Sequence, residues 1–454
     1  MHDRRRQNSD RVACAISAFA ALAVLATAPA SAADLLGTCC GDLEERIAEL
    51  EATSVRTGSR KTTLAISGLV NRALLSWDDG QANDIYSVTN DNRTSVVIIE
   101  GESAKFGSGW SAGFYMEFGI LGAGTGEVSQ IDDKGSTGVV EVRDTSWWIE
   151  NKHLGKISVG LTNASGLSGS VIEKDLSRTD KAAYSGVSDI GAGFFLRRSG
   201  VAGAQGLLPV TWGDVIDSLK EPDGEIVNYC TPELAGFIVS AFWGGDDFWN
   251  VSLGYEKEFG DLFEIGAGLA YNENREGEIA AVADHRTTAG SISVLHKPSG
   301  LNFTFAGGYR DFTERIVLNN GARGTPDSSD FHYLKAGLLK EVIALGDTAF
   351  YGEYARFNGI LSRGADAETV EGLGGLNPGA ACAAAGDACL VSGSEATVWG
   401  LGVVQHIDDA EAQLYLGYRH YDIDIGLLDV GGARVPSVPL SGFHTVLGGA
   451  IIEF

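Results

Sequence analysis

Residues 110–120 read WSAGFYMEFGI, and this stretch decides the fold class. Apolar side chains take the even positions from Trp110 to Ile120, whereas the odd positions hold Ser111, two glycines, Tyr115 and Glu117. A period of two places alternate side chains on opposite faces of an extended strand. The stretch therefore predicts a β-strand with one apolar face and one small or polar face.

The same alternation recurs along most of the chain, for example in 263–271, 301–309 and 412–418. Short turn sequences join the strands in pairs, at 106–109, 151–155, 258–261, 297–300 and 408–409. Longer polar connections separate the pairs, at 78–93, 121–138, 273–285, 313–329, 359–394 and 423–440. Tyr271, Tyr309 and Tyr418 lie near the ends of their apolar faces. An apolar exterior with interfacial aromatic residues, and turns that alternate with long loops, are typical of an outer-membrane barrel.

Parity decides the number of strands. The pattern marks seventeen strand-like segments, but a barrel with both chain ends in the periplasm needs an even number. The count becomes consistent only if 190–198 is not a wall strand, so that 163–222 is one long external connection. We therefore expect an all-β fold, a 16-stranded antiparallel transmembrane β-barrel that occupies residues 61–454.

Composition and charge exclude several other classes of protein. The chain has 454 residues with 61 Gly and only 9 Pro, and its formal net charge is −26. A nucleic-acid partner is not expected, because the chain has no basic stripe. No local motif supports a catalytic site, a phosphate-binding loop or a metal site. We expect neither an enzyme nor a cofactor.

The N-terminus has the features of an export signal. A basic segment is followed by an apolar run from Val12 to Ala28 and by the cleavage pattern Ala30-Ser31-Ala32. This pattern predicts a signal peptide over residues 1–33. Its loss removes four Arg and two Asp, which takes the net charge from −26 to −28.

Residues 34–60 form a separate segment, in which 42–55 predicts a short periplasmic helix. Leu43, Ile47 and Leu50 follow one another at helical spacing. The helix could serve oligomerisation or could pack on the barrel, and its length does not decide between the two.

Export places the cysteines where disulfides persist. Cys382 and Cys389 flank a short Ala-rich segment, which predicts a disulfide within an external loop. The connectivity of Cys39, Cys40 and Cys230 stays open.

The long connection 163–222 is the candidate site. A loop of this length is unusual unless it is functional. We expect part of it to fold into the channel, with Glu173, Asp175 and Asp180 facing bases on the wall, and with Arg178 and Lys181 in the same loop segment. The candidate wall residues are Glu117, Arg143, Arg310 and Arg419. The alternative is that the wall arginines pair with neighbours along the wall, such as Glu117, or that the loop stays at the surface.

Three parts of the chain resemble alphaproteobacterial porins. These are DLEERIAELEAT at 42–53 with WDDG at 77–80, the segment from Tyr229 through TPELAGF at 231–237 to Trp243-Gly244, and the terminal Phe454. The resemblance implies a trimeric, sixteen-stranded channel of the Gram-negative outer membrane, whose third loop folds into the pore. It also implies that Phe454 is a signal for the barrel-assembly machinery. Lipid and lipopolysaccharide would surround such a barrel.

The leading functional hypothesis is a water-filled porin for passive diffusion of ions and small hydrophilic solutes. A substrate-selective channel and a loop-based adhesin or receptor barrel are the alternatives. A plugged active transporter is disfavoured, because it needs about 22 strands.

Overall fold

The computed structural model describes residues 62–135, 140–162, 171, 173–180, 182–183, 186–221, 224–245, 247–275, 284–312, 328–361, 390–428, 434–437 and 439–454. The predicted signal peptide and the predicted N-terminal helix lie outside the described residues, as do Lys181 and every cysteine except Cys230. Within the described residues, no helix has the length and apolar character needed to cross a membrane.

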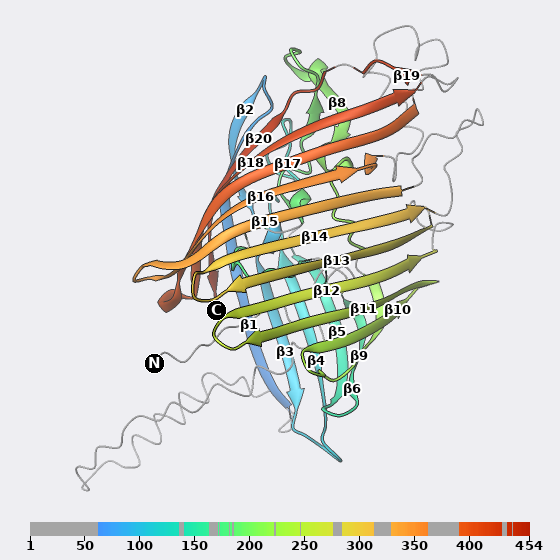
Figure 1. Ribbon diagram of the computed structural model, residues 1–454, viewed down its shortest axis with the longest axis vertical. Coiled ribbons are helices and arrows are strands. Elements are labelled where there is room, and N and C mark those ends of the chain that lie inside the picture. The colour runs from blue at the N-terminus through green and yellow to red at the C-terminus, as the bar shows by residue number, and fades with distance from the viewer. Residues whose placement is uncertain are drawn as a thin grey trace.

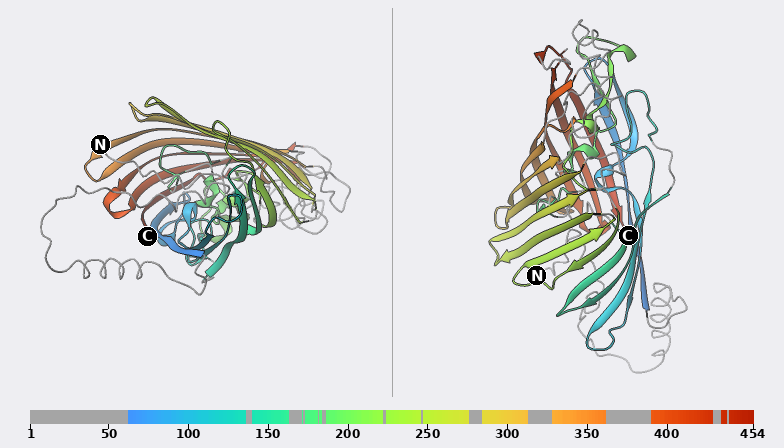
Figure 2. Two further views of the ribbon diagram at one scale, coloured as in Figure 1. Left: turned by 90° about the horizontal axis from the view of Figure 1, so that it is seen from below. Right: turned by 90° about the vertical axis from the view of Figure 1, so that its right-hand side faces the viewer.

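Sixteen antiparallel wall strands close into a barrel (Figures 1 and 2), which confirms the predicted fold class. In chain order the wall consists of β1 (Thr62–Asp78), β2 (Asn83–Thr89) continued by β3 (Val96–Ser103), β4 (Trp110–Ile120), β5 (Val140–Asn151), β6 (Gly155–Thr162), β9 (Gly224–Cys230), β10 (Phe237–Gly244), β11 (Phe248–Phe259), β12 (Phe263–Asn274), β13 (His285–His296), β14 (Leu301–Phe312), β15 (Ser328–Ile343), β16 (Gly346–Asn358), β17 (Leu390–Ile407), β18 (Ala412–Leu428) and β20 (Phe443–Glu453). The last strand, β20, pairs with β18 on one side and with β1 on the other. Closure leaves the sheet without an open edge, as a wall in lipid requires.

The predicted external connection 78–93 is wrong in its extent, because half of it is wall strand, namely Asp78 at the end of β1 and residues 83–89. Strand β2 pairs with residues 72–78 of β1, and β3 pairs with residues 62–69, so the two segments share one wall position. Only residues 79–82 form the turn. The Asp79 carboxylate makes this turn tight, because it accepts hydrogen bonds from the backbone N–H of Gln81 and of Ala82.

The two faces of the wall differ as the alternation predicts. On β18, Leu414 and Leu416 are exposed on the outside of the barrel, whereas Tyr415 and Arg419 are buried inside it. The outer face is therefore apolar, which suits a hydrocarbon environment.

Segment 190–198 is not part of the wall. It contains β7 (Phe195–Arg197), which pairs with β8 (Leu207–Thr211) in a separate two-stranded sheet. Three single-turn 3-10 helices accompany this hairpin, namely η2 (Val187–Asp189), η3 (Ala204–Gly206) and η4 (Trp212–Asp214). Strands β6 and β9 pair directly with each other, so residues 163–223, called the long loop below, connect two neighbouring wall strands.

Candidate functional site

The long loop is bound to the polar inner face of the barrel at three places. The first is the wall from β13 to β17, the second is β18, β20 and β1, and the third is the pair β13 and β14. Each place combines hydrogen bonds between loop and wall with buried loop residues. Because the inner faces of the strands face the lumen, these contacts place the described part of the loop against the lumen side of the wall.

Lys335 of β15 forms the centre of the first contact. Its side chain is fully buried, and its ammonium donates hydrogen bonds to the Asp175 carboxylate, to Thr179 Oγ1 at 2.7 Å and to the carbonyl of Ala183 at 2.8 Å. Nearby, the backbone N–H of Leu176 donates to Ser293 Oγ at 2.9 Å. A lysine with three acceptors has all its protons satisfied, which offsets the cost of removing the charge from water.

The second contact joins the middle of the loop to the last strands. Arg419 donates to the carbonyl of Val187 at 3.2 Å, and Tyr421 donates to the carbonyl of Ile190 at 2.9 Å. Aromatic rings add packing, since Trp212 lies 5.5 Å from Tyr421 and 5.9 Å from Phe443, centroid to centroid. Apolar side chains of the long loop and of the wall therefore form one common hydrophobic core.

The third contact binds the C-terminal end of the long loop, just before the chain re-enters the wall. Arg310 of β14 lies 3.0 Å from a Glu221 carboxylate oxygen, and it also donates to the carbonyl of Leu219 at 3.0 Å. His285 Nε2 lies 3.1 Å from the same carboxylate, and Thr287 Oγ1 lies 3.2 Å from it. Burial acts to raise the pKa of Glu221, but the Arg310 charge and the His285 hydrogen bond outweigh it and hold that pKa at about 2.

The expected pairing of the three loop acids with the three wall arginines is wrong. Asp175 pairs with Lys335, and Glu173 pairs with Lys220 of the same loop. The reason is the order in which successive parts of the loop pass the wall strands. Residues 173–179 pass over β13 to β15, whose inward base at that level is Lys335, while Arg310 meets the loop some forty residues later, at Glu221.

Arg178 and Asp180 lie beside each other in the loop, and Arg178 reaches the wall. Its guanidinium forms an ion pair of 2.7 Å with Asp347 at the start of β16 and lies 3.3 Å from Nδ1 of His406. Asp180 is half-buried beside it.

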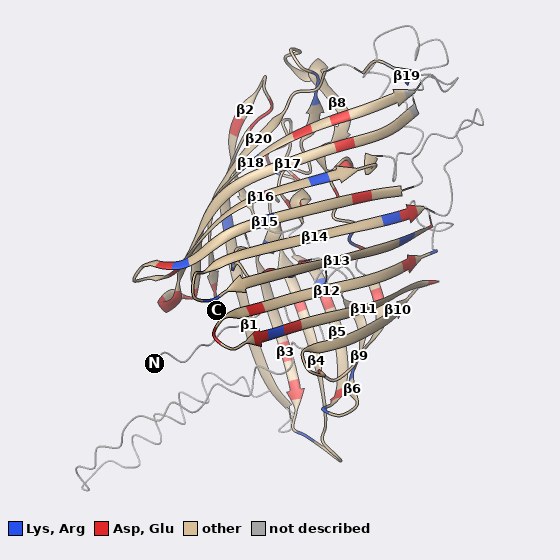
Figure 3. Ribbon diagram, viewed as in Figure 1, with Lys and Arg blue, Asp and Glu red and all other residues tan. Residues whose placement is uncertain are grey.

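The other two wall arginines pair along the wall. Arg419 forms an ion pair with Glu353 of β16, with Nε 2.7 Å from the carboxylate, and Arg143 of β5 lies 3.4 Å from Glu117 of β4. The Glu117 carboxylate also accepts a hydrogen bond from Tyr115 at 2.8 Å. Many charged positions of β11 to β18 lie toward the strand ends (Figure 3).

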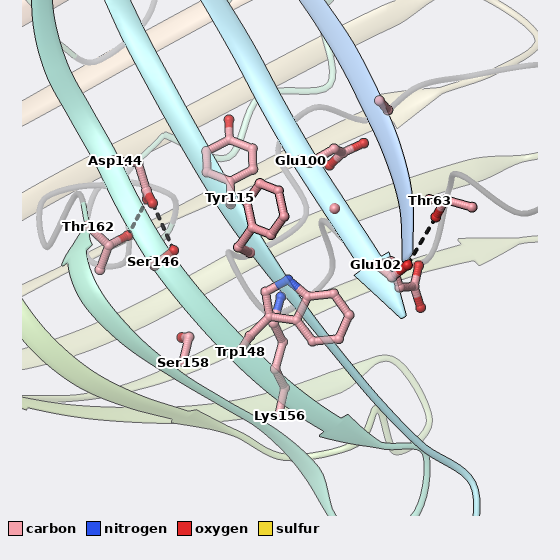
Figure 4. Close-up of a pocket in the computed structure, with 13 residues that line it drawn as sticks. Thr63, Glu100, Glu102, Tyr115, Asp144, Ser146, Trp148, Lys156, Ser158 and Thr162 are labelled. Atoms are coloured by element: carbon pink, nitrogen blue, oxygen red, sulfur yellow. Dashed lines mark hydrogen bonds between the residues drawn. The ribbon is translucent and has the colours of Figure 1, made fainter. Parts of the chain in front are cut away.

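A pocket of about 700 Å³, open-solvent space included, lies on the inner wall formed by β1 and β3 to β6. Its labelled lining in Figure 4 comprises Thr63, Glu100, Glu102, Tyr115, Asp144, Ser146, Trp148, Lys156, Ser158 and Thr162. Strand register puts these residues on one face: Thr63 is opposite Glu102, and Trp148 is opposite Ser158. The alternate residues Ile66, Trp147 and Ile157 are exposed on the outside of the barrel. The pocket therefore opens to the lumen.

Sequence reasoning missed Lys335, Glu353, Glu221 and His285. Lys335 shares a strand face with Phe331 and Tyr333, both buried. Because Phe331 and Tyr333 are aromatic, the sequence gives this strand face the character of a lipid-facing surface and does not indicate that Lys335 points inward. An isolated charge in the middle of a predicted barrel strand is the signal that could have marked Lys335 and Glu353 as lumen residues.

Comparison with solved structures agrees with the fold. The barrel resembles an anion-selective porin from Comamonas acidovorans, with a TM-score of 0.51, 14% identity, and coverage of 87% of this chain and 100% of that one. It also matches OmpT, an outer-membrane protein of Vibrio cholerae, with a TM-score of 0.48, 14% identity, and coverage of 88% and 99%. No family model matches the sequence, and no curated protein does. What the chain shares with the Comamonas porin is the fold, an antiparallel β-barrel.

Proposed function

We propose that this protein is a porin, a water-filled channel for passive diffusion of ions and small hydrophilic solutes across the outer membrane. The observation that carries the proposal is a closed sixteen-strand barrel with an apolar outside, whose polar inner face holds a long loop by buried ion pairs at Lys335 and Arg310. A sixteen-strand barrel is wide enough for an aqueous channel, and the loop narrows it.

The long loop is then the constriction. The alternative of a surface loop is disfavoured by its contacts, because described residues between 171 and 221 bond to inward-facing side chains of β13, β14, β15 and β18. Such a channel needs no cofactor and performs no covalent chemistry. Transport depends on the width of the waist and on the charges around it.

The resemblance of 42–53, 77–80 and 229–244 to alphaproteobacterial porins supports membership of that group and a homotrimer embedded in lipid and lipopolysaccharide. Anion selectivity is a property of the Comamonas protein. Ion selectivity follows from lumen charge rather than from barrel architecture. Without residues 1–33 the chain has a net charge of −28, and the wall arginines oppose it. We therefore expect a weak cation preference.

Planar-bilayer recording tests the proposal. Purified protein should give stable, large conductance steps, and a KCl gradient should give a reversal potential of the sign for cations. An absence of conductance steps from folded, heat-modifiable protein would favour the adhesin or receptor hypothesis instead.

A further inference from the structure

The pocket on β3 to β6 combines two features that recognise the same chemistry. Glu100 and Glu102 line it from β3, and Asp144 lines it from β5 on the other side (Figure 4). Between them, the ammonium of Lys156 lies 4.9 Å from the ring centroid of Trp148, over its face. An indole face attracts cations through its quadrupole.

Lys156 shows what kind of group the pocket accepts. Its side chain is an alkyl chain that ends in an ammonium, and the pocket holds this ammonium against the indole and among the carboxylates. The lining has three formal negative charges and one positive charge, so it still has a formal charge of −2 with Lys156 in place. That charge is balanced by a solute with two ammonium groups.

The indole is held in place by the backbone around it. A Cβ at Gly113 would lie 2.4 Å from the Trp148 ring, so only glycine at this inward position leaves room for the ring. The hydroxyls of Ser146 and Thr162 donate to Asp144, at 2.8 Å and 2.6 Å, and orient its carboxylate. Pre-positioned groups lose less entropy when a ligand binds.

We propose that this pocket is a binding site for alkyl diammonium solutes on their way through the channel. One ammonium lies between Glu100 and Glu102, the second lies beside Asp144, and the alkyl chain covers the Trp148 face as Lys156 swings aside. The inference rests on the proposed channel, because the solute reaches the pocket through the lumen.

The test is block of single-channel current by 1,6-diaminohexane, with hexane-1,6-diol as the neutral control. The parent should show concentration-dependent block by the diammonium and none by the diol. The double variant Glu100→Gln with Glu102→Gln should raise the half-blocking concentration at least about tenfold, whereas Lys156→Met should lower it by about the same factor. Glu225→Gln, a change at an exposed position of β9, should leave block unchanged.

Trp148→Leu separates aromatic recognition from charge alone. It should weaken block by 1,6-diaminohexane several-fold and leave block by Mg²⁺ unchanged. A parent channel that conducts normally without diammonium block would overturn the inference but not the porin. Equal block in the parent and the Glu100/Glu102 variant would also overturn it. If no current is seen, titration calorimetry of the folded protein in detergent decides, since absence of diammonium binding there overturns the pocket independently of the channel.

Discussion

The ammonium of Lys335, on the inner face of β15, bonds to the carboxylate of Asp175 in the long loop, and both side chains are almost completely removed from solvent. A wall strand and the loop are thus joined by a buried ion pair. Such a pair contributes little net stability compared with apolar residues, but it is costly to break on one side.

Lys335→Met should release the first loop contact, because it leaves the Asp175 carboxylate buried without its cation. We expect the free energy of unfolding in detergent to fall by about 3–5 kcal/mol, and open-channel current noise to rise. The double variant Lys335→Met with Asp175→Leu should recover most of the loss, since no charge is then stranded. Additive losses in guanidinium titrations of the two single variants and the double variant would contradict coupling of the two residues.

The Glu221 contact should make stability depend on acid pH. Its pKa of about 2 lies below the usual 4.5, so the ionised form stabilises the folded state above about pH 4.5, and this stabilisation is lost as the pH falls toward 2. The contribution at neutral pH is roughly 3 kcal/mol. Glu221→Gln should be less stable than the parent at pH 6, and the two should converge near pH 2. Parallel melting curves for the two proteins across this range would exclude the effect.

Neutralising Glu173, Asp175 and Asp180 together should reduce cation selectivity and change conductance, because three negative charges leave the proposed constriction. Since Asp175 is bonded to Lys335, the variant Glu173→Gln with Asp180→Asn tests charge without disturbing that pair. Asp261→Asn in the turn between β11 and β12 is the matched control and should keep parental values. A reversal potential and conductance equal to the parent in the triple variant would mean that the loop is not the constriction.

Deleting Phe454 should lower the amount of heat-modifiable barrel in the outer membrane. Its backbone N–H and carbonyl both form hydrogen bonds with the backbone of Gly68, at 3.0 Å. Its exposed ring lies beside that glycine on the lipid side, where it is accessible to an assembly factor. Phe454→Tyr keeps the aromatic ring and should assemble nearly normally. Parental levels of folded protein after the deletion would argue against the signal.

Peptide mapping without reductant should find Cys382 linked to Cys389. A loop of this size closed by a disulfide contributes roughly 2 kcal/mol, mostly to the loop itself. Cys230 is disulfide-bonded at the end of β9, and we expect the same map to link it to Cys39 or Cys40. Free thiols at positions 382 and 389 would refute the loop disulfide.

The sequence by itself determined the wall of this protein. Period-two alternation at residues such as 110–120 and 412–418 requires that one strand face contacts an apolar phase and the other a polar one. The need for an even number of strands then excluded 190–198 from the wall. These are local properties, since side-chain direction in a strand changes with every residue. The wall segment 83–89 was missed because it is too short for its alternation to stand out from a polar loop, and the outer ends of β17 and β18, 390–394 and 423–428, were likewise assigned to connections.

Only the tertiary structure decided which charges meet. Asp175 reaches Lys335, Glu221 reaches Arg310, and Arg143 stays with Glu117, although the composition of loop and wall allows other partners. The pocket around Trp148 likewise depends on strand register and on the space left by Gly113. The physical reason is that the Asp175–Lys335 and Glu221–Arg310 pairs join residues more than eighty positions apart. The path of the long loop through the barrel, which brings them together, depends on packing that no local pattern encodes.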